Sequence, residues 1–168
     1  MRTVLLSAGV CVVALTVVSA RHAGTPAQVA FATAPQSSPY DETADARHDI
    51  AAALALAKVD KKNVLLDFGA NWCPDCLVLS KLFDDDTVKP YRELNFHVVP
   101  IDVGRWTKNL DLNKEYGSPI DKGIPAVVVL APDGRMVDST KDGQLESARK
   151  STPAEILGYL KKWAPASR

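Results

Sequence analysis

The stretch NVLLDFGANWCPDC, residues 63–76, decides how this chain folds. Residues 63–70 form a short, almost continuous apolar run, which predicts a strand covered on both faces. Two cysteines, Cys73 and Cys76, follow this run directly. The residues beyond them repeat at helical spacing, with apolar side chains at Val78, Leu79, Leu82 and Phe83. We therefore expect the cysteine pair at the start of a helix that leaves a buried strand.

The rest of the chain also divides into helical and strand patterns. Further elements are predicted as a helix over 41–62, a short helix from about 87 to 93, a strand over 95–102, a long polar connection over 103–122 with one helical turn, a strand over 125–130 and a hairpin turning at 132–134. The last helix has a capping box, because Thr152 precedes Pro153 at the first helical position and Glu155 can reach back. This order predicts an α/β domain with helices on both faces of a central sheet.

Composition limits the classes of function. The chain has 168 residues, of which 46% are hydrophobic, enough for one domain with a packed core. Its formal net charge is zero, and no basic run or acidic tail is present. We therefore expect no nucleic-acid partner, and we expect a monomer.

The first twenty residues have the pattern of an export signal. Arg2 is followed by an apolar run from Val4 to Val18, which ends in the small residues Ser19 and Ala20. We expect residues 1–20 to be a signal peptide cleaved after Ala20, with an uncleaved N-terminal anchor as the alternative. Either reading places the protein outside the cytoplasm, in a bacterial periplasm.

Two regions are predicted after this leader. Residues 21–42 are rich in Ala, Pro, Ser and Thr and are expected to form a flexible linker, and residues 43–168 are expected to form the folded domain. Once the leader is removed, Cys73 and Cys76 are the two cysteines that the mature chain retains. A secreted domain held together by disulfides would carry more cysteines at wider spacings.

Four uses of the cysteine pair can be compared. Structural zinc needs four ligands, but the chain has no second pair, and His48 and His97 fall in separate predicted elements. Haem attachment needs a histidine directly after the second cysteine, where Leu77 stands. A purely structural disulfide would close so small a ring that its stabilising effect is slight.

Redox chemistry fits the local pattern best. The unpaired N–H groups and partial positive charge of a helix N-terminus favour the thiolate of Cys73. Pro74 is tolerated at this position because its missing N–H would have been unpaired. One helical turn brings Cys76 within reach of Cys73, so the pair can form and break a disulfide.

The stretch VLLDFGANWCPDC (64–76), with KGIPAVVVL (122–130) and PDG (132–134) further on, resembles the thioredoxin superfamily over residues 47–164. The resemblance implies a thioredoxin-like fold, in which a mixed central sheet is flanked by helices on both faces. Trp72 and the two cysteines match the family's W-C-x-x-C motif.

The resemblance also implies roles for other residues. Asp67 matches a buried acid that relays the proton of Cys76, although it could also be a strand residue facing water. Pro125 matches a cis-proline beside the disulfide, although it could be a trans proline opening an edge strand. The lysine that often partners the buried acid is absent, since the second strand offers Val98 and Val99 instead.

A substrate-binding surface is expected around the pair. Its predicted members are Trp72, Pro74, Asp75, Ile124 and Pro125. Trp72 is expected to serve both as core and as a platform. Arg105 and Trp106, in the long connection, are interpreted as ordinary surface residues outside the site.

The spacer residue Asp75 bears on the direction of electron flow. Its negative charge near the Cys73 sulfur would disfavour the thiolate by on the order of 1 kcal/mol, or roughly 30 mV for two electrons, which favours a reductant. The hypothesis is therefore an exported thiol-disulfide oxidoreductase that reduces protein disulfides through Cys73 and Cys76. It requires no cofactor, but it requires a membrane-borne or other thiol electron donor.

Two alternatives stay open. The same site could work as a disulfide oxidase or isomerase, or the domain could be a non-catalytic binding module with idle cysteines.

Overall fold

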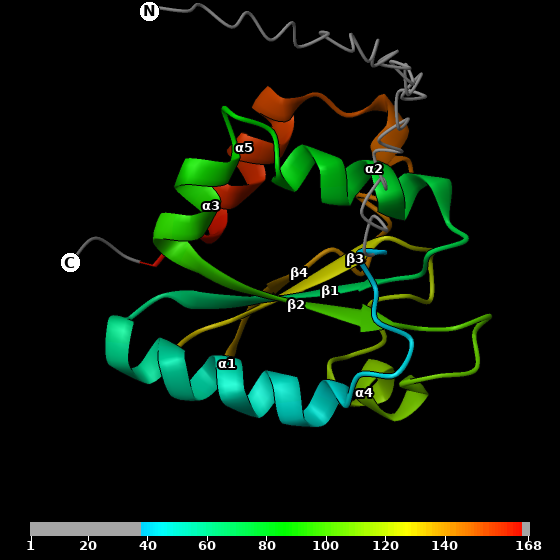
Figure 1. Ribbon diagram of the computed structural model, residues 1–168, viewed down its shortest axis with the longest axis horizontal. Helices are drawn as coiled ribbons and strands as arrows, with labels where there is room; N and C mark the ends of the chain where they lie inside the picture. The colour runs from blue at the N-terminus through cyan, green and yellow to red at the C-terminus, as the bar shows by residue number, and fades with distance from the viewer. Residues whose placement is uncertain (1–37, 166–168) are drawn as a thin grey trace, which may run out of the picture. The chain divides into compact units, whose positions relative to one another are not determined.

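Four strands form one mixed sheet in the order β2-β1-β3-β4 (Figure 1). The computed structural model describes residues 38–165, so the predicted leader and most of the predicted linker lie outside the described residues. The strands are β1 (Asn63–Gly69), β2 (Phe96–Asp102), β3 (Ala126–Leu130) and β4 (Met136–Ser139). β1 runs parallel to β2 and antiparallel to β3, and β4 pairs antiparallel with β3 at the other edge.

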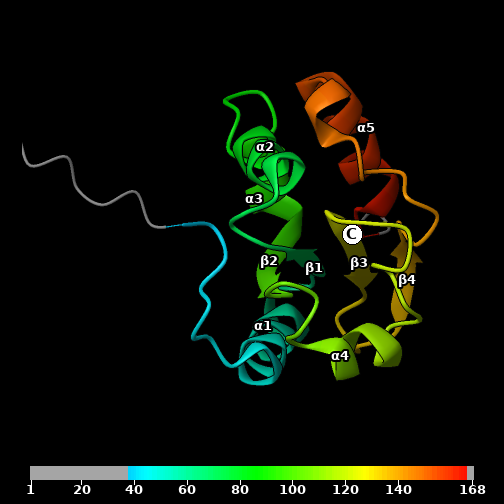
Figure 2. The ribbon, with the colours of Figure 1, turned by 90° about the vertical axis from the view of Figure 1, so that its right-hand side faces the viewer.

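Helices cover both faces of this sheet (Figures 1 and 2). One face carries α1 (Ala46–Asp60) and the short α4 (Leu110–Glu115). The other carries α2 (Pro74–Phe83), α3 (Lys89–Asn95) and α5 (Pro153–Trp163), with the 3-10 turn η1 (Ala148–Lys150) leading into α5. The predicted α/β fold, a mixed sheet flanked by helices on both faces, is confirmed.

The central strand β1 is buried along its whole length, as its apolar run predicts. Leu66 and Phe68 pack in the cluster formed with α1, whereas Leu65 packs with Leu79 of α2 on the opposite face. Side chains two positions apart on a strand point to the same face. Asp67 therefore faces the layer of α2, the helix that begins at the cysteine pair.

The predicted elements are confirmed, with small shifts at their ends. The first helix begins at Ala46 rather than near residue 41, because Asp45 caps it by accepting a hydrogen bond from the His48 N–H at 3.1 Å. The predicted capping box of the last helix is present between Thr152 and Glu155.

The predicted boundary between linker and domain is too late. Tyr40 falls in the predicted linker 21–42, yet only 1% of its surface is exposed, and it packs in the core with Ala46 and Ile50 of α1. The packed part of the chain therefore begins before residue 43.

Within residues 38–165, no helix has both the length and the apolar character needed to cross a membrane.

Candidate active site

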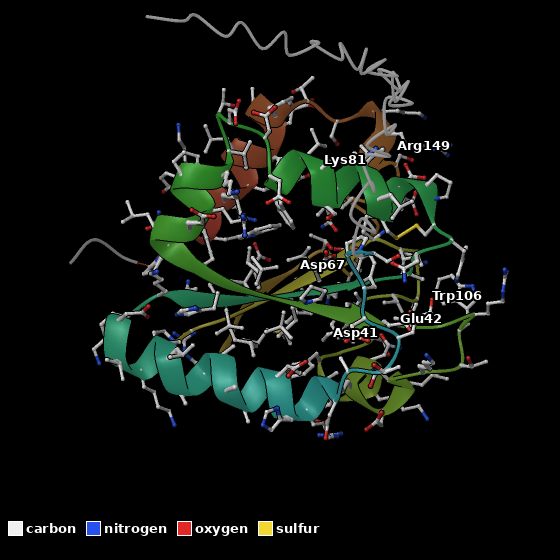
Figure 3. The ribbon with its side chains drawn as sticks, in the orientation of Figure 1. Asp41, Glu42, Asp67, Lys81, Trp106 and Arg149 are labelled. Carbon is white, nitrogen blue, oxygen red and sulfur yellow. A yellow bond between two sulfur atoms is a disulfide. The ribbon has the colours of Figure 1, made fainter. Side chains whose placement is uncertain are left out.

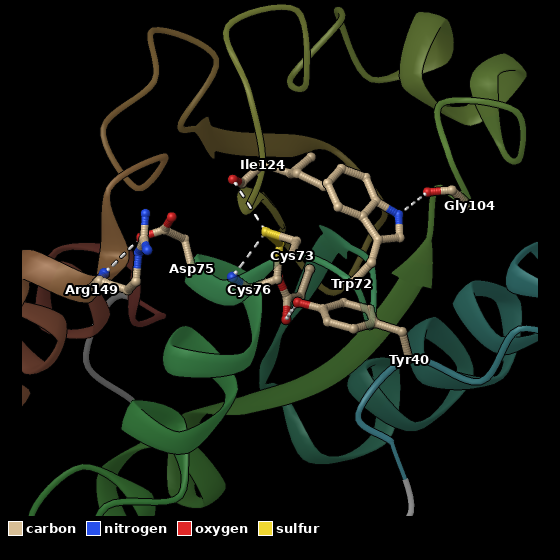
Figure 4. Close-up of a disulfide and its surroundings, with 9 residues drawn as sticks. Tyr40, Trp72, Cys73, Asp75, Cys76, Gly104, Ile124 and Arg149 are labelled. Carbon is tan, nitrogen blue, oxygen red and sulfur yellow. Dashed lines mark hydrogen bonds and ion pairs between the residues drawn. A yellow bond between two sulfur atoms is a disulfide. The ribbon is translucent and has the colours of Figure 1, made fainter.

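Cys73 is the N-cap residue of α2, and Pro74 is the first residue of the helix. The extended backbone of Cys73 lets its Sγ accept a hydrogen bond from the Cys76 N–H at 3.1 Å. Cys73 and Cys76 form a disulfide, with their Cα atoms 5.3 Å apart (Figure 4). The expected placement of the pair, one turn apart at a helix N-terminus, is confirmed.

The two cysteines differ in access to solvent. Cys73 keeps 4% of its surface exposed, whereas Cys76 is fully buried. Cys73 Sγ also lies 3.7 Å from the carbonyl oxygen of Ile124, and the Ile124–Pro125 peptide bond is cis, as the resemblance implies. Cys73 is therefore the member of the pair that keeps some contact with solvent, and its sulfur lies beside the backbone of the Ile124–Pro125 loop.

Asp67 is buried, as the resemblance implies, with 3% of its surface exposed (Figure 3). Burial raises its pKa to about 7, and a hydrogen bond from Tyr40 opposes this rise. The Tyr40 hydroxyl donates to Asp67 Oδ2 at 3.0 Å, while Oδ1 has no hydrogen-bond partner among residues 38–165. Asp67 can therefore gain or lose a proton near neutral pH.

Asp67 also lines a cavity of about 780 Å³ beside α2. Leu77, Ser80 and Lys81 of α2 form one wall, and Val98 of β2 lies on the other. The cavity gives the buried carboxyl a neighbouring open space, although sequence spacing alone did not predict one.

Asp75 corrects the expectation of an uncompensated negative charge near the sulfur. It is largely buried, and its Oδ1 accepts hydrogen bonds from the backbone N–H and the Nε of Arg149 at 2.9 and 3.0 Å (Figure 4). Burial would raise the pKa of Asp75, but the bonds and charge of Arg149 outweigh it and hold that pKa below its usual range. The negative charge therefore has a cation paired to it, and the argument for a reductant from Asp75 alone fails.

Trp72 is more exposed than its predicted role as core and platform requires. Its surface is 41% exposed, and its Nε1 donates to the Gly104 carbonyl oxygen at 2.7 Å. Arg105 and Trp106, which the sequence reading left outside the site, lie against it. The Arg105 guanidinium is 5.7 Å from the Trp72 ring centroid. The Trp106 ring packs edge-on against the Trp72 ring, with 6.3 Å between the two ring centroids. The long connection thus adds two side chains to the surface beside Cys73.

Tyr40 and Arg149 are the other residues that sequence reasoning missed. Tyr40 lies 27 positions before Asp67, and Arg149 lies 74 positions after Asp75. No motif links these pairs, so the sequence carries no signal for either contact.

Comparison with known proteins agrees with this geometry. A family described as thioredoxin-like matches residues 45–132, which is 88 of the 168 residues. The chain belongs to the thioredoxin-like family. The match begins at the N-cap of α1 and ends just after β3, so it includes the cysteine pair and the cis-proline loop.

Solved structures of this family resemble the chain. A crystal structure of a disulphide isomerase from Xylella fastidiosa Temecula1 is 45% identical, with a TM-score of 0.72, and the alignment covers 74% of this chain and 95% of that one. The oxidised C-terminal domain of DsbD from Neisseria meningitidis is 26% identical, with a TM-score of 0.54 and coverage of 71% and 97%.

A curated relative is more distant. Probable nucleoredoxin 3 from Oryza sativa subsp. japonica is 28% identical over 100 residues, which is 48% of this chain but 21% of that protein. The thioredoxin-like chain described here thus combines the family fold with a Cys73–Cys76 disulfide in CxxC spacing. It is a thiol-disulfide oxidoreductase.

Proposed function

We propose that this thioredoxin-like protein reduces disulfides of exported protein substrates. In the dithiol form, the Cys73 thiolate attacks one sulfur of a substrate disulfide. A mixed disulfide forms between Cys73 and the substrate, and the other substrate sulfur leaves as a thiolate. The greater exposure of Cys73 compared with Cys76 supports this assignment of the attacking sulfur.

The second step releases the substrate. Asp67, as a carboxylate, accepts the proton of the Cys76 thiol, and the resulting thiolate attacks the Cys73 sulfur. The Cys73–Cys76 disulfide forms, and the second substrate sulfur leaves as a thiolate, so two electrons pass from the protein to the substrate. The proposed surface for the substrate backbone is formed by Ile124 and Pro125, with Trp72, Pro74 and Asp75 around it.

One observation supports reduction as the direction. Strongly oxidising pairs have a highly stabilised thiolate at the attacking cysteine. Among residues 38–165, one N–H group, that of Cys76, donates a hydrogen bond to Cys73 Sγ. Arg149 is paired with Asp75, the acidic residue of the spacer, so its charge is partly compensated there. We therefore place the pair toward the reducing end of the family.

The proposal includes the compartment and the electron source. The leader pattern over 1–20 supports export to a bacterial periplasm, with the domain either released or held by an uncleaved anchor. The chemistry needs no cofactor beyond the two cysteines. Because an oxidising compartment converts the dithiol to the disulfide, a membrane-borne or other thiol donor must return two electrons to the pair.

An insulin-reduction assay with a measured midpoint potential tests the proposal. We expect turnover by the wild type, loss of turnover in Cys73→Ser, and a potential nearer to about −270 mV than to about −120 mV. A value near −120 mV would reject the reductase direction. Equal and negligible turnover in both proteins would instead support a binding domain with idle cysteines.

Isomerisation is the second candidate, favoured by the 45% identity to a structure described as a disulphide isomerase. Isomerisation transfers no net electrons, because a thiol of the substrate itself can resolve the mixed disulfide. Cys76→Ala separates the two activities. If reduction is the function, this variant stops turning over and traps substrates on Cys73; if isomerisation is the function, it still reactivates a scrambled disulfide protein.

A further inference from the structure

We infer that Tyr40 is a positioning residue of the redox site, whose hydroxyl fixes the buried Asp67 carboxyl and leaves Oδ1 free to accept the proton of Cys76. This inference rests on the proposed function for the proton transfer, but not for the interaction between Tyr40 and Asp67. The two residues lie 27 positions apart in the sequence, and Figure 4 shows Tyr40 among the surroundings of the disulfide.

The Tyr40 ring is held by the segment that precedes the cysteines. The backbone N–H of Tyr40 donates to Asn71 Oδ1 at 3.2 Å, and Asn71 Nδ2 donates to the Tyr40 carbonyl oxygen at 2.8 Å. Asn71 lies two positions before Cys73, so the same turn that presents the attacking sulfur also holds Tyr40. This pair of bonds fixes where the phenol enters the core.

Gly69 provides the space for that ring. A Cβ at Gly69 would overlap the Tyr40 ring and hydroxyl, so any other residue there would displace the tyrosine. Tyr40 therefore has three distinct contacts with the stretch 63–76. Asp67 accepts a hydrogen bond from its hydroxyl, Gly69 leaves room for its ring, and Asn71 binds its backbone. A tyrosine that only filled space in the core would need the room at Gly69 but neither of the two hydrogen-bonded contacts.

The hydroxyl has a defined electrostatic effect. Burial, followed by the charge of Asp67, raises the pKa of Tyr40 above its usual range, so the phenol keeps its proton at neutral pH. It can then serve only as a donor to Asp67 Oδ2, which favours the carboxylate over the neutral acid. Tyr40 thus counteracts burial and keeps Asp67 able to act as a base near neutral pH.

The geometry also selects an oxygen. With Oδ2 occupied by Tyr40, Oδ1 is the oxygen of Asp67 without a hydrogen-bond partner among the described residues. Removing the Tyr40 hydroxyl would leave both oxygens of Asp67 without this donor. The carboxylate would then be less stable relative to the neutral acid, and its orientation would be less fixed. Filling the ring position with phenylalanine would leave the packing in place.

Tyr40→Phe tests this inference, with Tyr116→Phe as the matched control, because Tyr116 is half-buried and makes no hydroxyl hydrogen bond within residues 38–165. Carbon-13 NMR of the oxidised protein follows the titration of Asp67 where neither cysteine titrates. We expect Tyr40→Phe to move the Asp67 midpoint upward by about one to two pH units, as loss of a hydrogen bond to a charged group predicts, and Tyr116→Phe to leave it unchanged.

The second readout is the pH profile of mixed-disulfide release in the reduced protein, which we expect to shift to higher pH by the same amount. An unchanged Asp67 midpoint in a folded Tyr40→Phe protein would overturn the inference. If Tyr40→Phe does not fold, the titration is measured in Asn71→Ala instead. We then expect a smaller rise of the Asp67 midpoint, and the absence of any rise would contradict the inference. An inactive wild type whose Asp67 midpoint still responds to Tyr40→Phe would refute the proposed function and leave the Tyr40–Asp67 interaction standing.

Discussion

Two aspartates, Asp67 and Asp75, belong to the site around the disulfide, and their pKa values are shifted in opposite directions. Asp75 has a cation, since Arg149 binds its Oδ1 twice, and its pKa lies below the usual range despite burial. Asp67 has no cation paired with it among residues 38–165, and burial raises its pKa to about 7 against the single hydrogen bond from Tyr40. The same side chain therefore stays charged at one position and titrates near neutral pH at the other.

This difference separates two tasks within the site. A carboxylate that is always ionised can balance the local charge, but it is a poor acceptor of a proton at neutral pH. A carboxyl whose pKa lies near 7 can accept a proton and release it again. The chain thus places the carboxyl that titrates near neutral pH on the buried strand β1, and it pairs the carboxylate between the two cysteines with the exposed Arg149 (Figure 4).

The largest expected effect is on stability. Asp67 has a higher pKa in the folded protein than the usual 3.8, so the folded state binds this proton more tightly and stability falls as the pH rises from about 4 to about 7. We expect Asp67→Asn to raise the free energy of unfolding by on the order of 4 kcal/mol above pH 7, and by little below pH 4. Denaturant unfolding of the oxidised protein across this range measures the effect.

Asp75→Asn is the control with the opposite sign. The pKa of Asp75 is depressed in the folded protein, so its contribution to stability is present at neutral pH and is lost as the pH falls below its usual range. Arg149 is largely exposed, which limits the expected destabilisation to about 1 kcal/mol. If the free energies of unfolding of Asp67→Asn and Asp75→Asn changed with pH in the same way, the two aspartates would not differ as described.

The next largest effect is on the proton transfer. Loss of a positioned base costs about 100-fold, so we expect Asp67→Asn to slow mixed-disulfide release at pH 7 by that factor. The deficit should shrink at high pH, where the Cys76 thiol loses its proton to solvent. Asp75→Asn should change the same rate by less than about threefold, since Asp75 transfers no proton in the proposed steps. Stopped-flow tryptophan fluorescence can follow both variants.

A glycine pair tests whether Tyr40 is held as described. Gly69→Ala places a Cβ inside the Tyr40 ring, and overpacking of this kind destabilises a core by about 1–3 kcal/mol. Gly158→Ala, in helix α5, meets nothing within 4 Å and should stabilise the protein by about 0.5–1 kcal/mol. Thermal unfolding of both variants gives the answer, and a tolerated Gly69→Ala would show that the ring can move aside.

The smallest expected effect concerns the charge pair. Arg149→Met leaves Asp75 unbalanced near Cys73, which disfavours the thiolate and makes the pair more reducing. We expect the midpoint potential to become more negative by about 30 mV or less, because the Arg149 side chain is 62% exposed and solvent screens it. A shift to a less negative potential would contradict the proposed role of Arg149.

Local patterns predicted most of the fold. The strand over 63–70, the cysteines at a helix start and the capping box at Thr152 each depend on neighbours in sequence, and the structure places all three as expected. The resemblance added the cis Pro125 and the burial of Asp67, which composition and periodicity could not supply.

Long-range contacts were beyond the sequence. Tyr40 lies among Ala, Pro and Ser residues without periodicity, which is typical of a linker, and only the folded chain brings it to Asp67. The sequence also does not reveal that the Trp72 ring, expected to serve as core and platform, is 41% exposed and lies against Trp106. The partner of Asp75 is equally hidden in the sequence, since Arg149 follows 74 positions later.

Alkylation of the reduced protein across pH tests the central claim most directly. The account predicts that iodoacetamide labels Cys73 but not Cys76 in the folded protein, with half-maximal reactivity of Cys73 at least about one pH unit below the 8.5 of free cysteine. Equal labelling of both cysteines, or a Cys73 midpoint at or above that of free cysteine, would contradict it.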